Sequence, residues 1–513
     1  PNVSINLERE FKEMKLTAQK LISAHMNIWK YTYDASQLDI DAAINKLYSS
    51  NNVLTAQRNH IIKNRATPDD TEFSKQWQYV QSNDRDIDAD LAWDMTTGGL
   101  TANGDTIVVC VIDDGINFSH PDLAPNLWVN YNEIPNNNID DDGNGYVDDV
   151  RGWNADADND NPAHSGFWEG HGSAVAGVVG AKGNNGEGVA GINWDVKLMI
   201  VKGGGQESRA IAAYSYALEN RKLYNATNGE KGAFVVSTNA SWGVNGGQAA
   251  NAPLWCAMYD TLGEYGVLNA GATANANTNV DVAGDLPTQC PSDYLVTVTN
   301  TSQADVKVSQ AGYGLTTIDL GAPGEGTWTV AQGTDGYASF GGTSGATPHV
   351  AGTIALMYSI PCFSFADIAK NDPKRAAEIV RDHILNGIDS LSSLKGVTKT
   401  GGRLNVNNSV KVLAKSMCNI ASTNNMEMNG DEIVIYPNPL SGNNLTLSLK
   451  SQSKRQGTIE VQDLTGKVVS RKNIMIEIGS NSFGIETKKL SSGLYHVSVI
   501  SDEKSSRLMF TKQ

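Results

Sequence analysis

The sequence predicts an α/β fold built on a doubly wound, mainly parallel sheet, with a small α+β unit before it and an all-β sandwich after it. Three patterns carry this prediction. From about residue 85, apolar runs of strand type alternate with helical runs. Before that point a strand, a helix and a strand follow one another within about 65 residues, and beyond residue 432 apolar and polar side chains alternate between Gly, Asn and Pro turns. Alternating strands and helices imply right-handed crossovers and a buried sheet covered by helices on both faces.

The first unit, residues 1–67, is expected to be a small α+β domain. Its expected elements are a helical segment over 7–24, a strand over 27–33, a helix over 39–50 that begins at Asp39 or Asp41, and a strand over 52–57. Acidic residues in the first turn support the second helix, because they oppose the positive end of the helix dipole. The polar stretch IKNRATPDDTEF that follows is expected to be a cleavable linker.

The second unit, residues 68–418, is expected to hold the parallel sheet. Its expected strands are TIVVCVI at 106–112, KLMIVK at 197–202, AFVVSTNAS at 233–241, YGVLNAG at 265–271 and YLVTVTN at 294–300. Its clearest helices are expected over 171–181 and 208–225. In sheets of this kind active sites form at the carboxyl ends of the strands. A polar linker, 419–432, and a β-sandwich, 433–513, are expected to complete the chain.

Charge and hydropathy exclude several classes of protein. The chain has 513 residues and a net charge of −16, and it contains no Lys/Arg cluster, which argues against nucleic acid or an anionic membrane as the main partner. No run of 18 apolar residues occurs, so no membrane span is expected. The chain begins at Pro1 without a leader-type apolar segment, as expected if a leader has been removed or the sequence trimmed.

The five cysteines suggest two disulfides and one free thiol. Cys110 lies inside the apolar run TIVVCVI and is expected to be buried and unpaired. The other four cysteines allow three pairings, and we expect the local ones, Cys256–Cys290 and Cys362–Cys418. No CxxC pair occurs, which disfavours a zinc site. Reduced cysteines of a cytosolic protein are the alternative.

Three polar residues stand where strands end or helices begin. Asp113 follows a buried strand, His171 opens a helix of small residues, and Ser344 opens another in GGTSGATPHVAG. Each alone has a structural explanation: a turn residue, a solvated histidine, and an N-cap. Together they occur in the order Asp, His, Ser, which is one of the orders of convergent serine triads.

The blocks around these residues resemble the subtilisin family of serine proteases. VIDDGINFSHPDL, GHGSAVAG and GGTSGATPHVAG resemble its three catalytic blocks, and NASWG and TIDLGAPG resemble two more. The resemblance covers about residues 68–418. It implies a protease in which His171 takes the Ser344 proton and Asp113 holds the imidazole in one tautomer and stabilises its charged form. The helix that begins at Ser344 would direct backbone N–H groups at the developing oxyanion.

The resemblance also implies an oxyanion-hole amide and a substrate-binding strand. Asn275 best fits the amide position, although Ala274 stands where the family has Gly. Asn277 is the alternative, and an Asn-rich surface loop without a catalytic role is another. The segment Ser241, Trp242 and Gly243 is expected to contact the backbone of a substrate that binds as an added strand.

Other departures from the family pattern leave the pocket shape open. Asp114, Ala174 and Gly345 stand where the family usually has Ser or Thr, a second His, and Met. Asp114 could compete with Asp113 for the catalytic role, but Asp113 stands first after the strand. His120 and His349 are expected to hold turns and helix packing rather than to take part in chemistry.

The stretch NNIDDDGNGYVDDVRGWN is expected to bind Ca²⁺. Its oxygen ligands have the spacing of a calcium loop, with Gly145 at the sharp turn. The twelfth position is Arg151 rather than Glu, so the loop is no EF-hand, and Asp149 could supply the missing carboxylate. A solvated acidic loop is the alternative. The expected ligands are Asp140, Asp142, Asn144, the Tyr146 carbonyl and Asp148.

The flanking units imply how the protein is made and exported. The N-terminal unit resembles the inhibitory propeptide of the family, whose tail would pass through the active-site cleft, with cleavage between about Asn64 and Glu72. The C-terminal unit resembles the sorting domain of type IX secretion substrates, which implies a secreted or cell-surface protein exported across an outer membrane. A binding module is the alternative for that unit. For the whole chain the alternative is a catalytically silent adhesion or scaffold protein with this fold.

Overall fold

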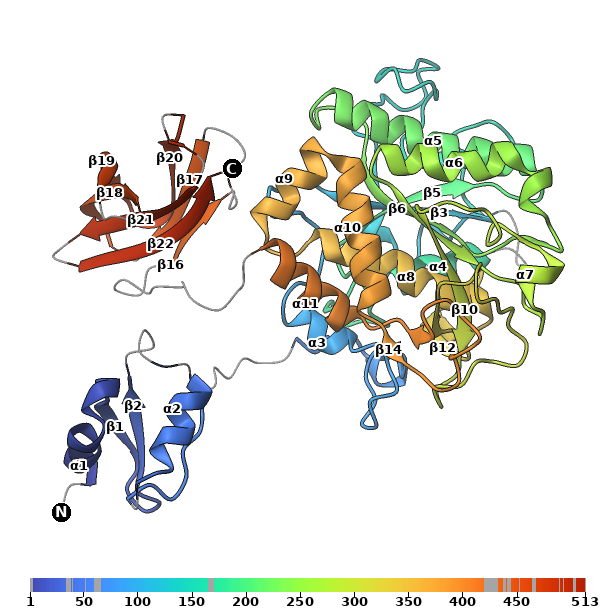
Figure 1. Cartoon of the computed structure of the whole chain (residues 1–513). Coiled ribbons are helices and arrows are strands. Elements are labelled where there is room, and N and C mark those ends of the chain that lie inside the picture. The colour runs from blue at the N-terminus through green and yellow to red at the C-terminus, as the bar shows by residue number, and fades with distance from the viewer. Residues whose placement is uncertain are drawn as a thin grey trace. The chain divides into compact units, whose positions relative to one another are not determined.

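The computed structural model contains two compact units, Pro1–Asn64 and Arg65–Gln513 (Figure 1). The structure describes residues 3–33, 38, 40–50, 52–59, 66–164, 170–418, 432–436, 440, 444–451, 453–463, 467–488, 490–491, 493–501 and 504–512. Asp39, the start of the polar stretch after the first unit, and nearly all of the expected linker 419–432 lie outside these residues. The domain boundaries at 67, 418 and 432 stay predictions.

The N-terminal unit joins a hairpin of two antiparallel strands to helices through a small core of its own. Its elements are α1 (Val3–Glu10), η1 (Lys12–Met14), β1 (Thr17–Ser23), β2 (Ile28–Thr32) and α2 (Ile40–Leu47). The buried side chains of this core are Leu7, Phe11, Met14, Leu16 and Ala43. The strand expected over 27–33 and the helix expected over 39–50 are thus both present.

Two predictions for this unit are wrong. The helical segment expected over 7–24 stops at Lys15, whose left-handed φ of 47° ends η1, and the chain continues as β1. The strand expected over 52–57 is absent, because β1 and β2 pair only with each other among the described residues and leave that segment without a partner. Val53 packs against the core while Leu54 is 96 % exposed.

Residues 66–418 are organised around a nine-stranded sheet in the order β14-β15-β11-β10-β8-β6-β3-β5-β4. The strands are β3 (Ile107–Asp113), β4 (Gly152–Asn154), β5 (Lys197–Lys202), β6 (Phe234–Ala240), β8 (Leu268–Ala272), β10 (Leu295–Thr301), β11 (Leu320–Pro323), β14 (Asp389–Ser390) and β15 (Gly402–Arg403). Neighbouring strands are parallel except for β14 and β15. The prediction of a mainly parallel sheet is confirmed, and all five predicted strands lie in it.

Helices cover both faces of this sheet. Every residue of β3 is buried, and its side chains alternate between two hydrophobic cores. Val109 and Val111 belong to the core that contains α4 (His171–Gly180) and α8 (Thr343–Tyr358). Val108, Cys110 and Ile112 belong to the core that contains α5 (Glu207–Ala226) and α6 (Pro253–Glu264). In Figure 1, α5 and α6 accordingly lie across the sheet from α8.

The sheet reverses its winding at β3. The chain places β5 on one side of β3 and then β6 on the other, and β8, β10 and β11 follow outward from β6. Open sheets bind their ligands at such a switch point, at the carboxyl ends of the strands. Asp113 is the last residue of β3, and Ser241 directly follows β6.

Shorter elements surround the sheet and complete this part of the chain. These elements are η2 (Phe73–Lys75), α3 (Ala89–Trp93), η3 (Ala124–Asn126), β7 (Val244–Asn245), η4 (Ala249–Asn251), α7 (Val280–Ala283), β9 (Asp285–Leu286), β12 (Thr327–Val330), β13 (Tyr337–Phe340), α9 (Phe363–Asn371), α10 (Pro373–Asn386) and α11 (Val406–Met417). Two of the strand pairs are antiparallel: β7 pairs with β9, and β12 pairs with β13.

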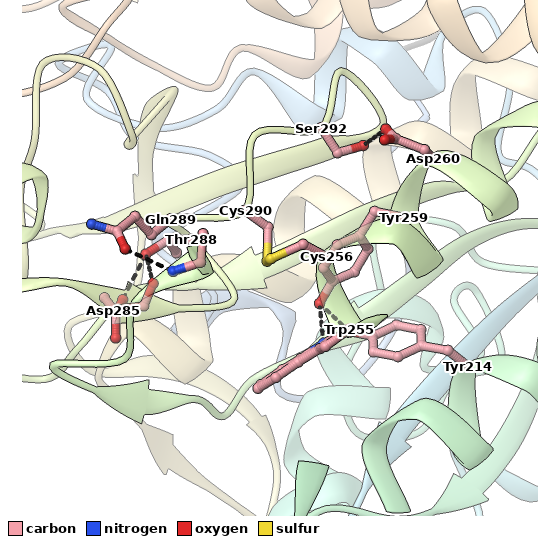
Figure 2. The surroundings of a disulfide bond; sticks show 11 residues. Tyr214, Trp255, Cys256, Tyr259, Asp260, Asp285, Thr288, Gln289, Cys290 and Ser292 are labelled. Carbon is pink, nitrogen blue, oxygen red and sulfur yellow. Dashed lines mark hydrogen bonds between the residues drawn. A yellow bond between two sulfur atoms is a disulfide. The ribbon is translucent and has the colours of Figure 1, made fainter. Parts of the chain in front are cut away.

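Both expected disulfides are present. Cys256 of α6 is bonded to Cys290, in the turn after β9 (Figure 2), and Cys362 is bonded to Cys418, which directly follows α11. Cys110 is free and buried, as predicted.

The C-terminal part is an antiparallel β-sandwich. One sheet has the order β16-β17-β20 and the other β19-β18-β21-β22, and a shared apolar core lies between them. The strands are β16 (Glu432–Tyr436), β17 (Asn444–Ser451), β18 (Arg455–Asp463), β19 (Val468–Ile476), β20 (Gly479–Glu486), β21 (Gly493–Ser501) and β22 (Lys504–Lys512).

In the part of the chain that the structure describes, no single helix has both the length and the hydrophobicity needed to cross a membrane. The bent pair α8 and α9 meets these criteria by length and composition alone, and α8 is buried in the core.

Candidate active site

Asp113 and His171 are joined by a hydrogen bond at the carboxyl end of β3. The Oδ1 atom of Asp113 lies 2.8 Å from Nδ1 of His171. Asp113 is buried, whereas the His171 side chain is 31 % exposed and its ring meets Phe340 edge-on. Nε2 of the imidazole has no hydrogen-bond partner among the described residues. The pair is therefore arranged as a base held by a buried acid.

Asp114 accepts hydrogen bonds from the start of α4 rather than from the imidazole. Its carboxylate accepts hydrogen bonds from the backbone N–H groups of Gly170, His171 and Gly172, at 3.0, 3.2 and 2.9 Å. These groups belong to the first turn of α4, where N–H groups lack partners within the helix. Asp114 thus caps α4, which fixes where His171 begins the helix.

Glycine at position 172 allows α4 to approach β3 this closely. A Cβ atom on Gly172 would lie 2.5 Å from the Gly115 carbonyl oxygen and 2.9 Å from Cβ of Asp113. Gly115 itself has a φ of +96°, a conformation that favours glycine and that turns the chain directly after Asp114. Both glycines therefore set the distance between the acid and the imidazole.

Burial and the ion pair shift the pKa values of both groups. Burial raises the pKa of Asp113 above its ordinary value, and the charge and hydrogen bond of His171 oppose that rise. Burial alone would lower the pKa of His171, but the charge and hydrogen bond of Asp113 more than offset it, so the pKa of His171 lies above its ordinary value. The imidazole is then a stronger base than a free histidine.

Ser344 is the second residue of α8, and its side chain is buried. Its hydroxyl donates to the backbone carbonyl of Ser241 at 3.0 Å, and the Ser241 hydroxyl donates to the Ser344 carbonyl at 3.1 Å. Within the described part of the chain, no hydrogen bond joins Ser344 to His171. The helices whose first turns carry these two residues, α4 and α8, pack against each other.

Asn275 lines a cavity of about 210 Å³ beside the start of α8. Its Oδ1 atom accepts from the Thr343 N–H at 2.9 Å and lies 3.1 Å from the Thr343 hydroxyl, which also donates to the Thr273 carbonyl at 2.6 Å. Its Nδ2 donor has no partner among the described residues and is left for a ligand. Asn277, the alternative oxyanion residue, is exposed like Asn275 but does not line the cavity.

The predicted substrate segment lines the same cavity. Ser241, Trp242 and Gly243 all contribute to its wall. The Trp242 indole donates to the Ile112 carbonyl at 2.7 Å and stacks on Trp255, so this side chain is anchored in the protein. The backbone of the segment is then the part available to a substrate.

His120 and His349, the two histidines for which a structural role was predicted, make contacts within the protein. His120 accepts from the Asp122 N–H through Nδ1 and its ring meets Tyr337 edge-on. His349 is fully buried in α8, with Nδ1 2.8 Å from the Gly345 carbonyl, and burial lowers its pKa to about 4.

The acidic loop brings together a set of carboxylates that differs from the predicted one. Oxygen atoms of Asp140 and Asp142 lie within 4.8 Å of each other and of an oxygen of Glu133. Glu133 precedes the loop and was not predicted; its carboxylate accepts from the N–H groups of Asp141, Asp142 and Asp148. No sequence pattern marks it, because it stands seven residues before Asp140 and outside the regular spacing of the loop.

The other predicted ligands also make contacts within or beside the loop, and their role as ligands stays a prediction. Asp148 accepts from the N–H groups of Asn137 and Asn138, and Asn144 donates its side-chain amide to Asp149 at 2.9 Å. Asp149, which could have supplied a further ligand, is fully buried and also accepts from the Tyr216 hydroxyl at 2.6 Å. The Tyr146 ring packs beside Tyr216.

Comparison with known families decides the classification. The family model described as "Subtilase family" matches residues 104–410, more than half of the 513 residues. The chain belongs to the subtilase family. A second model, "Secretion system C-terminal sorting domain", matches residues 434–511. The predictions of the family, of a sorting domain and of an exported protein are therefore confirmed.

Individual relatives of this subtilase come from several organisms. It is 31 % identical over 336 residues to "Extracellular protease" of Xanthomonas campestris pv. campestris, covering 63 % of this chain and 54 % of the relative. It is 29 % identical over 337 residues to "Subtilisin-like protease 1" of Plasmodium berghei, covering 61 % of this chain and 51 % of the relative. It is 28 % identical over 350 residues to "Thermitase" of Thermoactinomyces vulgaris, covering 67 % of this chain and 99 % of the relative. The chain thus spans about half the length of the first two relatives.

A solved structure of a protease from Pseudoalteromonas arctica matches 68 % of the subtilase chain and all of its own chain, with a TM-score of 0.47 and 24 % sequence identity.

Proposed function

We propose that this subtilase is an exported serine endopeptidase that hydrolyses peptide bonds through an acyl-enzyme intermediate. The observation that carries the proposal is the 2.8 Å bond between His171 and the buried Asp113, at the strand ends that also carry Ser241. Ser344 would be the nucleophile, His171 the general base and acid, and Asp113 the group that orients the imidazole.

The Ser344 hydroxyl would first have to leave the Ser241 carbonyl. Rotation of the Ser344 side chain about its Cα–Cβ bond would redirect the hydroxyl, so that its bond to Ser241 is exchanged for one to Nε2 of His171. His171 takes this proton as Oγ attacks the substrate carbonyl, and returns it to the leaving amine when the peptide bond breaks. Water then hydrolyses the acyl-enzyme by the same route in reverse.

The oxyanion of the tetrahedral intermediate would be held by two donors. The Nδ2 group of Asn275 is one, because its Oδ1 atom is already fixed by Thr343. The N–H of Ser344 is the other, because it lies in the first turn of α8, where helix N–H groups lack intrahelical partners. Donors fixed before the reaction stabilise the charge that appears during it.

Calcium would stabilise the fold at the acidic loop. The three carboxylates of Glu133, Asp140 and Asp142 converge, and hard oxygen donors of this kind suit Ca²⁺. Burial raises the pKa of Asp142, and the charge of Asp140 raises it further, so a bound cation would relieve a repulsion. Asp148 and Asp149 would act on the loop backbone and on neighbouring side chains rather than as ligands.

The flanking units would act before and during export. The N-terminal unit would serve as a propeptide that inhibits the enzyme until it is cleaved, and the sorting domain would be read by the type IX secretion machinery. The propeptide role is tested by adding a peptide of residues 1–64 to enzyme that lacks them. Inhibition is expected, and full activity at saturating peptide would contradict it.

A fluorophosphonate probe tests the catalytic proposal directly, because it reacts with an activated serine. The wild-type chain should be labelled, and both Ser344→Ala and His171→Ala should abolish the labelling while the melting temperature changes little. A folded wild-type protein that resists the probe and hydrolyses no peptide would instead be the silent scaffold.

A further inference from the structure

The cavity beside Asn275 contains a carboxylate in its wall. Its described lining consists of Ser241–Gly243, Asn245, Ala272–Asn275, Asp285 and Thr343. Asp285, in β9, is the ionisable residue of this set, and its side chain is only 1 % exposed. A volume of about 210 Å³ is on the scale of one long side chain rather than of a whole ligand.

The hydrogen bonds of Asp285 fall on one of its two oxygens. Oδ2 accepts from the hydroxyl of Thr288 at 2.7 Å, from the hydroxyl of Thr273 at 3.0 Å and from the N–H of Ala274 at 3.1 Å. Oδ1 accepts no hydrogen bond from any described residue. One oxygen therefore anchors the carboxylate, and the other is available to a group that enters the cavity.

The segment that carries Asp285 is held on both sides. Asp285 pairs with Asn245 of β7, and five residues further on Cys290 is bonded to Cys256 of α6. Figure 2 shows Asp285 and Thr288 beside this disulfide, with the bond between them drawn. The position of the carboxylate is thus fixed before any substrate arrives, which is what a specificity pocket needs.

The Asp285 carboxylate is buried, and the described residues that line the cavity offer it no opposite charge. Burial raises the pKa of Asp285, and the hydrogen bonds from Thr288, Thr273 and Ala274 oppose that rise. No cationic side chain contributes to the described lining. A buried charge is stabilised when it is paired with an opposite charge, so the cavity is matched to a cationic group supplied from outside.

We propose that Asp285 gives this subtilase a preference for Lys or Arg at P1, the residue on the amino side of the bond that is cut. The proposal rests on the proposed endopeptidase function, because it places the scissile carbonyl between Ser344 and Asn275. A side chain that precedes this carbonyl would enter the cavity that Asn275 and Thr343 share with Asp285. An acidic residue in the corresponding pocket gives trypsin its preference for basic residues.

The alternative is a purely structural role, in which Asp285 only ties Thr273 and Thr288 together. The two roles predict different kinetics. A structural carboxylate supports the cavity for every substrate, whereas a specificity carboxylate discriminates between a cationic P1 side chain and a neutral one of similar length. Lys and Met serve as that pair, because both are long and unbranched.

The experiment measures kcat/KM of the full chain, after removal of residues 1–64, on two peptides that differ only in Lys or Met at P1. The wild type should prefer Lys by about tenfold or more. In Asp285→Asn, kcat/KM for the Lys peptide should fall by about 10- to 100-fold, while the value for the Met peptide stays within about threefold.

Two matched variants separate charge from packing. Asp260→Asn removes the same charge from an exposed position on α6 and should leave the Lys-to-Met ratio within about twofold of wild type. Thr288→Val removes one anchor of the Asp285 carboxylate but keeps its charge, and should retain a preference for Lys.

An unchanged Lys-to-Met ratio in Asp285→Asn overturns the proposal, and so does an equal fall for both peptides. Should Asp285→Asn fail to fold, the wild type alone decides: a peptide-library profile without enrichment of Lys or Arg at P1 rejects the preference. The endopeptidase proposal fails separately, when the wild type neither cleaves any peptide nor reacts with a fluorophosphonate.

Discussion

The ring of His171 is fixed by Asp113 through a 2.8 Å hydrogen bond at the end of a strand that is buried along its whole length. Because Asp113 is buried and His171 is partly exposed, the hydrogen bond sets the tautomer of the imidazole from inside the protein.

The first prediction concerns the pH dependence of catalysis. Asp113 raises the pKa of His171, so Asp113→Asn should move the acid limb of the kcat/KM profile to lower pH, since the imidazole then stays unprotonated until the pH is lower. The same change should lower kcat by about 10⁴-fold, because the wrong tautomer is favoured. Peptide hydrolysis between pH 5 and 9 measures both effects.

Asp114→Asn is the control for this prediction. An amide oxygen can still accept from the first turn of α4, so its activity should fall by less than about tenfold. A larger loss in Asp114→Asn than in Asp113→Asn would assign the catalytic acid to Asp114.

The second prediction concerns the oxyanion donor. Asn275→Ala should lower kcat by about 100-fold or more and leave KM nearly unchanged, because the amide acts on charge that exists only in the transition state. Asn275→Asp keeps an acceptor for Thr343 but loses the donor, so its kcat should fall at least as far. Asn277→Ala should stay within about threefold of wild type, and a result in the reverse order would identify Asn277 as the donor.

The third prediction concerns calcium. Excess chelator should lower the melting temperature of the wild type and speed its autolysis, because three converging carboxylates then repel one another. In Glu133→Gln the melting temperature should depend less on calcium, and differential scanning calorimetry with and without the ion measures the difference. A wild-type melting curve that ignores chelator would count against the site.

The fourth prediction concerns the Cys256–Cys290 disulfide. Replacing both cysteines by Ala should lower the free energy of unfolding by about 3–4 kcal/mol, because a closed loop limits the unfolded chain. The Cys362–Cys418 pair spans 56 residues against 34, so its removal should cost only about 0.5 kcal/mol more. Urea denaturation of the two double variants tests this ranking, and a loss below 1 kcal/mol for either pair would contradict it.

Much of the central fold could be predicted because its strands are buried on both faces. The strand that contains Val109, β3, is apolar at every position before Asp113. A continuous apolar run of this length predicts a buried strand without any need to recognise an alternating pattern. The N-terminal unit was harder. Helix-type spacing continues past Lys15 although the backbone turns there, and the apolar run at Val53 could form no strand without a partner to pair with.

The site was predictable where chemistry follows a strand or helix end, and less so where it depends on the tertiary structure. Asp113, His171 and Ser344 each stand at such an end. Glu133 lies beside Asp140 and Asp142 in the folded chain although it precedes the loop. Asp285 lies in the cavity wall, on a strand that pairs with β7. Residues of this second kind have no mark in the local sequence.

The placement of β3 between two cores has a consequence for how this lineage can diverge. Its side chains pack into a hydrophobic core on each face of the sheet, so the position of Asp113 is fixed by that packing. The cavity wall comes instead from segments that follow other strands, among them the one bearing Asp285. Substitutions in that wall would then change the proposed P1 preference without altering Asp113 or His171.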